Sequence, residues 1–115
     1  MAEPQKELRL RVMAEYMSSG IWVIGERGAF RHGMIEHASL KLPTNLAQAF
    51  NDWIEWYEDN LSTDEVIFDI EKFNAEGLRL ATELKKFLGS DVYVEFVPEG
   101  EKGLGQSLEI KLDTE

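Results

Sequence analysis

The chain contains no cysteine, and only two of its 115 residues are histidine. Without cysteine, neither a disulfide framework nor a thiolate metal site can form. No apolar run approaches the roughly 18 residues that a membrane-spanning helix needs, and the first residues have no hydrophobic signal-peptide core. We therefore expect a cytoplasmic protein that does not enter membranes and is stabilised by its own hydrophobic core.

Lysine and arginine are absent from the thirty residues between Leu42 and Glu71, where eight acids lie. The whole chain carries 22 acids against 12 lysines and arginines, a formal net charge of −10 at pH 7. So acidic a surface repels the phosphates of DNA and RNA, which argues against direct nucleic-acid binding. It is compatible with a basic protein partner, and equally with charge that serves only solubility.

The first part of the chain has the pattern of a β-hairpin. Residues 8–16 alternate apolar and polar side chains, which is the period of a half-buried strand. A Ser-Ser-Gly turn follows, and residues 21–24 form a second apolar run. We expect a hairpin over residues 8–26, with Arg9 and Arg11 on the wetter face of its first strand.

Two further strands are predicted near the end of the chain. Residues 92–97 and 108–112 alternate in the same way, and the glycine-rich residues 98–106 between them indicate a flexible turn region. Residues 25–41 have no clean period, so we expect an irregular loop there with a short strand at Met34–His37.

The first predicted helix begins near Pro43, where Asn45 and Gln48 have the spacing of a capping box. Six apolar side chains fall within an arc of about 100°, which predicts the core face: Leu46, Phe50, Trp53, Ile54, Tyr57 and Leu61. Three acids fall on the opposite side: Asp52, Glu55 and Asp59. Trp56 lies between the two faces, roughly 60° outside the core arc on this helical wheel.

The second predicted helix repeats apolar residues at intervals of three and four, and Gly89 is placed to end it. Its stripe consists of Ile70, Phe73, Gly77, Leu80, Ala81, Leu84, Phe87 and Leu88. The small residues in the middle of the stripe predict a close approach to the sheet or to the first helix. The element order ββααββ predicts an α+β fold: one mainly antiparallel four-stranded sheet with two helices packed on one face, in a single domain over residues 1–115.

No motif of a known enzyme class occurs in the sequence. His32 and His37 accompany Glu26 and Glu36 in one loop, but their interval matches no standard metal-ligand spacing. We interpret them as ordinary histidines and expect no metal, no cofactor and no enzymatic activity. An acid–base site built from these four residues stays a further alternative.

The segment Phe73–Phe96 contains an apolar helix stripe, a glycine and then a strand, and it follows a helix with Trp53 and Tyr57. Over residues 42–96, about half of the chain, this pattern resembles small acidic bacterial proteins. Some proteins of that kind are immunity partners of polymorphic or contact-dependent toxins. The resemblance concerns the structural pattern and carries over no functional residues.

We therefore expect a binding protein: an intracellular immunity protein that occludes the active site of a basic, nuclease-type toxin with an acidic helix face. The predicted partner-binding residues are Asp52, Glu55, Trp56, Glu58, Asp59, Asp64 and Glu65. Trp56 has two possible roles, packing at the edge of the core or anchoring the partner. The alternative function is a structural or adaptor domain that forms a homodimer through the hairpin edge or Trp22.

Overall fold

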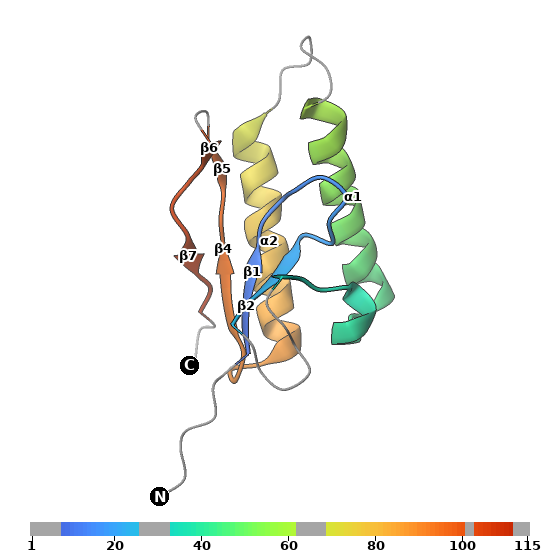
Figure 1. Ribbon diagram of the computed structural model, residues 1–115, viewed down its shortest axis with the longest axis vertical. Helices are drawn as coiled ribbons and strands as arrows, with labels where there is room; N and C mark the ends of the chain where they lie inside the picture. Colours follow the sequence, from blue (N-terminus) through green and yellow to red (C-terminus); the bar gives the residue numbers. More distant parts are fainter. Residues whose placement is uncertain (1–7, 26–32, 62–68, 101–102, 112–115) are drawn as a thin grey trace, which may run out of the picture.

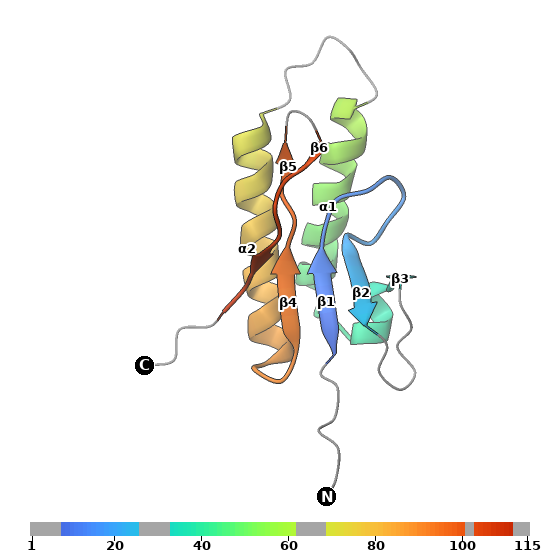
Figure 2. The same cartoon turned by 60° about the vertical axis from the view of Figure 1, so that its left-hand side comes forward.

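The computed structural model describes residues 8–25, 33–61, 69–100 and 103–111. In these residues a five-stranded sheet lies against two helices, and both helices cover the same face of the sheet (Figures 1 and 2). The strands follow one another across the sheet in the order β3 (Gly33–Met34), β2 (Ile21–Gly25), β1 (Arg9–Val12), β4 (Tyr93–Phe96) and β7 (Leu108–Glu109). The helices are α1 (Thr44–Leu61) and α2 (Ile70–Leu88), so the predicted α+β class with two helices on one face is confirmed.

The prediction of a mainly antiparallel four-stranded sheet is wrong in detail, because β1 and β4 pair in parallel. The predicted hairpin is present, with Leu10 opposite Val23 in β2, but Leu10 also lies beside Val94 in β4. A parallel pair needs a long crossover, and the two helices between β2 and β4 supply it. The sheet is therefore mixed, and β4 lies in its interior with β7 antiparallel on its other side.

Several strand boundaries also differ from the prediction. The first strand ends at Val12, well before residue 16. Of residues 108–111, the described part of the predicted last strand, β7 covers only two. Residues predicted as a flexible turn include a small ribbon of β5 (Glu99–Gly100) and β6 (Gly103–Leu104). The predicted strand at Met34–His37 is reduced to β3, and a 3-10 helix, η1 (His37–Leu40), follows it.

The core face predicted for α1 is confirmed where its side chains are described. Phe50, Trp53, Ile54 and Tyr57 are buried, and Leu46 packs partly buried against the core. The indole of Trp53 stacks on the ring of Phe73 with centroids 4.8 Å apart, and its Nε1 donates to the Phe73 carbonyl oxygen at 3.0 Å. This pair joins the two helices at the centre of the core.

The glycine in the stripe of α2 permits the close approach that the sequence predicts. A Cβ atom at Gly77 would lie 2.5 Å from Phe96 Cε1 and 2.6 Å from Trp53 Cζ2, so there is no room for a side chain. Asp69 caps the start of α2 by accepting from the backbone N–H of Lys72, and Gly89 ends it with a φ of 93°. Phe87 was predicted in the buried stripe and is 44% exposed instead.

Candidate functional site

The outer face of α1 presents most of the acids that the sequence singles out. Asp52, Glu55 and Asp59 are exposed, as expected for positions opposite the core arc, whereas Glu58 is half-buried. Asp64 and Glu65, which continue the acidic run in the sequence, lie outside the described residues. We call Asp52, Glu55, Glu58 and Asp59, together with Trp56, the acidic face of α1.

Asp52 and Glu58 each accept a hydrogen bond within the molecule, and Asp59 is not without a partner either. The backbone N–H of Met17, in the loop between β1 and β2, donates to Glu58 Oε2 at 2.5 Å. Gln48, predicted in a capping box, donates its Nε2 to Asp52 Oδ1 at 2.9 Å. Neither donor is a cationic side chain, so Asp52 and Glu58 keep their negative charge uncompensated by these contacts. No partner of Glu55 occurs among the residues that the structure describes.

Trp56 is half-buried at the edge of the core. Its indole meets the ring of Phe73 edge-on, with centroids 5.3 Å apart and planes at 80°. The rest of the ring lines a hollow of about 640 Å³ between α1 and α2, together with Asp52, Lys72 and Arg79 among others. Core packing and partner contact are therefore compatible for this residue, because its inner edge is packed and its outer side borders open space.

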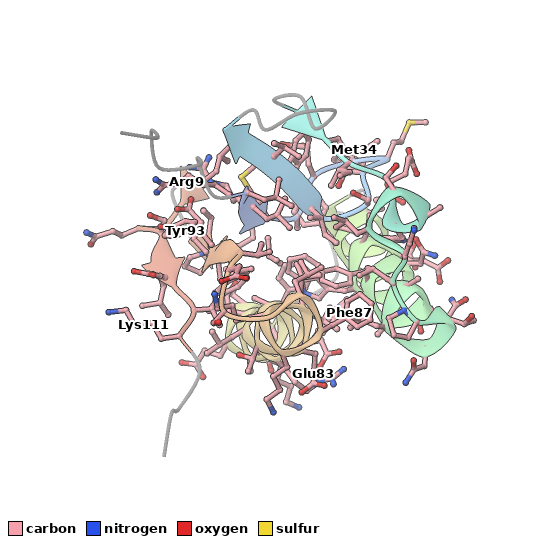
Figure 3. The ribbon with its side chains drawn as sticks, turned by 90° about the horizontal axis from the view of Figure 1, so that it is seen from below. Arg9, Met34, Glu83, Phe87, Tyr93 and Lys111 are labelled. Atoms are coloured by element: carbon pink, nitrogen blue, oxygen red, sulfur yellow. The ribbon has the colours of Figure 1, made fainter. Side chains whose placement is uncertain are left out.

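The arginines of β1 lie on the opposite side of the molecule from the acidic face. Arg11 Nε is 2.6 Å from Glu95 Oε2, and Arg9 lies over the ring of Tyr93 at 4.2 Å. Figure 3 shows Arg9 and Tyr93 on the side of the sheet away from the helices. These two arginines consequently do not neutralise the acids of α1; Arg27 lies outside the described residues.

Two acids outside α1, Glu15 and Glu99, lie near each other and near Tyr57 in a way that the sequence did not predict. Burial, together with the nearby charges of Glu99 and Glu15, raises the pKa of Tyr57 to about 12. Burial, followed by the charge of Glu15, also raises the pKa of the Glu99 carboxyl. Glu15 follows β1 and Glu99 follows β4, so the parallel pairing of these strands brings the two acids to the same end of the sheet. No local pattern in the sequence indicates that juxtaposition.

His37, the histidine that the structure describes, is held by contacts within the fold. His37 Nε2 is 2.8 Å from the carbonyl oxygen of Ser19, and its ring packs against Phe50 with centroids 5.7 Å apart. Within the described ranges no group of three or more histidines and acids is arranged to hold a metal ion. His32 and Glu26, the other half of the alternative acid–base site, lie outside the described residues.

A comparison with known families identifies the kind of protein. A family model described as Serratia CdiI immunity protein-like matches residues 8–99, from β1 to the start of β5. This chain belongs to that family. The resemblance to toxin-immunity proteins, noted in the sequence over residues 42–96, is thus confirmed over a longer stretch. No curated protein matches the chain in a sequence search.

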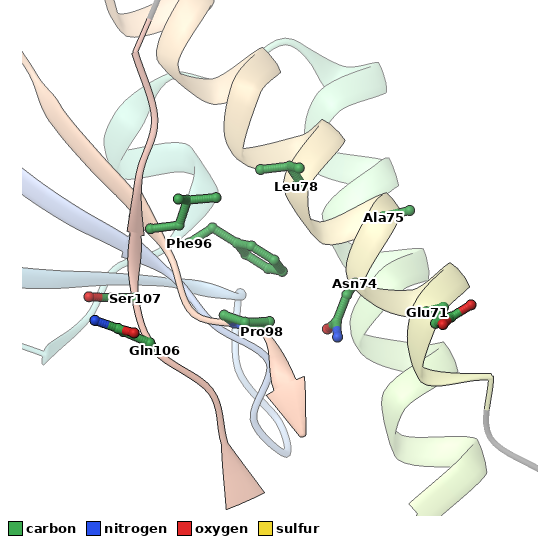
Figure 4. Close-up of a pocket in the computed structure, with 9 residues that line it drawn as sticks. Glu71, Asn74, Ala75, Leu78, Phe96, Pro98, Gln106 and Ser107 are labelled. Atoms are coloured by element: carbon green, nitrogen blue, oxygen red, sulfur yellow. The ribbon is translucent and has the colours of Figure 1, made fainter. Parts of the chain in front are cut away.

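A second hollow of this immunity-type protein lies on the other side of α2, against the sheet (Figure 4). It measures about 600 Å³, and Leu78, Phe96, Pro98 and Leu108 are among the residues that line it. Glu71 is the one charged residue in its lining. Its chemistry is therefore mainly apolar, in contrast to the charged margins of the hollow beside Trp56.

The hairpin edge that the homodimer alternative needs is partly covered. Trp22 pairs with Met34 of β3, so β3 rather than β2 forms this edge of the sheet. The indole N–H of Trp22 donates to the Met13 carbonyl oxygen at 3.0 Å.

No helix in the described part of the chain is long and apolar enough to cross a membrane.

Proposed function

We propose that this chain neutralises a cognate toxin by placing the acidic face of α1 over the toxin's basic, nucleic-acid-binding active site. Membership in the immunity family supports a toxin as partner. The observation that carries the proposal is that Asp52 and Glu55 are exposed on a helix with no lysine, arginine or histidine. A nuclease toxin needs a positive surface to hold phosphates, and an acidic helix is the complementary surface.

The mechanism is steric occlusion and involves no chemistry by the immunity protein. The acids attract the toxin over a distance and accelerate association, and Trp56 slows dissociation when its outer side is covered by the partner. Tryptophans at the centre of an interface, surrounded by polar residues, commonly dominate the binding energy. Neutralisation takes place in the cytoplasm, where the nucleic acids that such a toxin degrades are found.

The direct test is an inhibition assay with the cognate toxin domain. The variant Asp52→Asn/Glu55→Gln/Asp59→Asn removes three negative charges with little change in shape. We expect about tenfold or more of it to be needed for half-inhibition of nucleic-acid cleavage, because charge complementarity and steering are both reduced.

The matched control removes three exposed acids elsewhere, in the variant Glu36→Gln/Asp91→Asn/Glu109→Gln. It changes the net charge equally, so a loss confined to the α1 variant separates a specific interface from a general charge effect. Equal inhibition by the wild type and the α1 variant would sink the proposed interface. If the toxin had no nuclease activity, the proposal that this face blocks a nucleic-acid-binding active site would be wrong.

A further inference from the structure

The hollow beside Trp56 is one half of a longer groove between α1 and α2. Another hollow of about 440 Å³, distinct from the hollow of Figure 4, adjoins it, and Ala49 and Arg79 line both. Leu46 and Phe87 line this adjoining hollow, and Figure 3 shows Phe87 between the two helices in the view from below. We call the two hollows together the interhelix groove. It runs along the surface of the helix layer that faces away from the sheet.

The groove combines apolar residues with charged margins that differ on its two sides. Its apolar lining includes Ala49, Leu46, Trp56 and the exposed ring of Phe87. The α1 margin is acidic at Asp52. The α2 margin carries bases as well as acids, which form the pairs described below.

On the α2 margin, two of the bases are already matched by acids of the same helix. Arg79 Nη2 is 2.7 Å from Glu76 Oε2, and Lys86 Nζ is 3.5 Å from Glu83 Oε2. With Lys72, the α2 margin carries three bases against two acids and has a net charge of +1, whereas the α1 margin is negative at Asp52. An occupant therefore has to supply its positive charge on the side that faces α1.

We propose that the interhelix groove receives an amphipathic helix of the toxin, with an apolar stripe in the groove and lysines or arginines along the flank facing α1. Leu46 and Trp56 are ten residues apart, which is about 15 Å of helix at 1.5 Å per residue. That length accommodates about three turns of a partner helix, whose apolar anchors recur at intervals of three and four residues.

This inference rests on the proposed function, because the groove shares Asp52 and Trp56 with the acidic face of α1. It adds the form of the toxin segment and extends the interface to Phe87, which lies beyond the acids. A groove between two helices fits a third helix better than a strand, since side-chain rows on the partner lie between the rows of the margins.

The first test compares two exposed apolar residues of α2 that face opposite hollows. Phe87→Ser alters the interhelix groove, and Leu78→Ser alters the apolar hollow of Figure 4. Calorimetric titration with the cognate toxin domain is expected to show about tenfold or greater loss of affinity for Phe87→Ser. For Leu78→Ser the expected change is within about twofold. Both side chains are more than a third exposed, so both variants are expected to fold.

The second test uses the absence of native cysteine, which makes any introduced thiol unique. Ala49→Cys, labelled with a photoreactive benzophenone, is expected to cross-link to one toxin peptide whose apolar residues recur every three or four positions beside lysines or arginines. Ala47→Cys, two residues away on another side of α1, is the control and is expected not to cross-link there.

The outcomes separate this inference from the proposed function. Unchanged affinity of Phe87→Ser, a larger loss for Leu78→Ser, or a cross-linked peptide with the period of a strand would overturn the helix in the groove. A cross-link to a second copy of this chain would overturn it too. If any of these results accompanies weakened binding by the charge-neutralised α1 variant, the acidic interface stands without the groove.

Discussion

The two helices have the same kind of inner face and opposite kinds of outer face. Inside, Trp53 of α1 and Phe73 of α2 stack on each other in the core. Outside, α2 balances its charges at short range: both Arg79 and Lys86 are paired with an acid three residues earlier. The outer face of α1 contains acids and no lysine or arginine at all. Packing requires the inner faces to match, but it leaves the outer charges free to vary.

That difference separates two uses of surface charge. Exposed pairs such as Glu76–Arg79 contribute at most about 1 kcal/mol and keep a helix solvated without a strong external field. Like charges gathered on one face repel one another and produce a field that extends about a Debye length, roughly 8 to 10 Å at physiological salt. Repulsion among the acids of α1 therefore lowers folding stability, and under the proposed function a positive partner would offset it.

Reversing the charge on the outer face of α1, which makes it resemble that of α2, is expected to have the largest effect, a loss of toxin affinity. Asp52→Lys/Glu55→Lys gives α1 a balanced outer charge like that of α2, and places like charges against a basic toxin. We expect affinity for the toxin domain, measured by calorimetry, to fall about 100-fold or more. Glu36→Lys/Glu109→Lys, with the same change in net charge, is the control; a comparable loss there would mean that net charge alone matters.

A methyl group at Gly77 should disturb the inner faces that the two helices share. Gly77→Ala places Cβ 2.5 Å from Phe96 Cε1, so the ring must shift. We expect the free energy of unfolding in urea to fall by about 1 to 2 kcal/mol, because overpacking outweighs the gain in helix propensity.

The double variant Gly77→Ala/Phe96→Leu tests whether that ring is the cause. Removing the ring atoms that crowd the new Cβ should make the two substitutions non-additive, with a coupling free energy above about 0.5 kcal/mol. Strict additivity of the two single effects would show that the crowding lies elsewhere.

Removing Glu58 should have a smaller effect, because this acid holds a loop. Glu58→Ala deletes the acceptor of the Met17 N–H, and we expect a loss of about 1 kcal/mol in unfolding free energy. Amide hydrogen exchange at Met17 should accelerate at the same time. Glu55→Ala is the matched control on the same helix and should change stability by less than about 0.5 kcal/mol. Unaltered protection of Met17 would contradict the role given to Glu58.

The smallest expected effect concerns Glu99, an acid outside α1 whose pKa is raised. The pKa of Glu99 is raised in the folded protein, so its contribution to stability is complete below its ordinary pKa of 4.5 and is lost as pH rises through the folded pKa. At pH about 7, Glu99→Gln should therefore raise the thermal midpoint by about 2 °C or less. Near pH 4 the difference should shrink, and a gain that grows toward low pH would contradict the assigned cause.

Much of the fold follows from periodicity. The apolar stripes of α1 and α2 predicted their core faces, because burial of one face imposes a fixed spacing. The alternation in residues 8–16 and the apolar run in residues 21–24 predicted the hairpin. The parallel pairing of β1 with β4 was not predicted, since alternation in a strand carries no information about its neighbour's direction. Phe87 was placed in the core because the stripe continues to it, but its ring borders the hollow between α1 and α2 and is 44% exposed.

The candidate site was predicted only in its outline. A helical wheel places Asp52 and Glu55 opposite the core, and the structure leaves both exposed. It does not predict that Glu58 accepts from a loop residue 41 positions away, or that Lys72 and Arg79 of α2 border the same hollow as Trp56. These relations depend on how two helices and a loop come together, which no single segment specifies.

The central claim is tested most directly by the salt dependence of association with the toxin domain. Stopped-flow measurements between about 0.01 and 0.15 M NaCl cover Debye lengths from about 30 to 8 Å. For the wild type we expect the association rate constant to fall about tenfold or more across this range, whereas Asp52→Asn/Glu55→Gln/Asp59→Asn should show a much flatter dependence. Equal slopes for the wild type and this variant would contradict a toxin-binding role for the acidic face of α1.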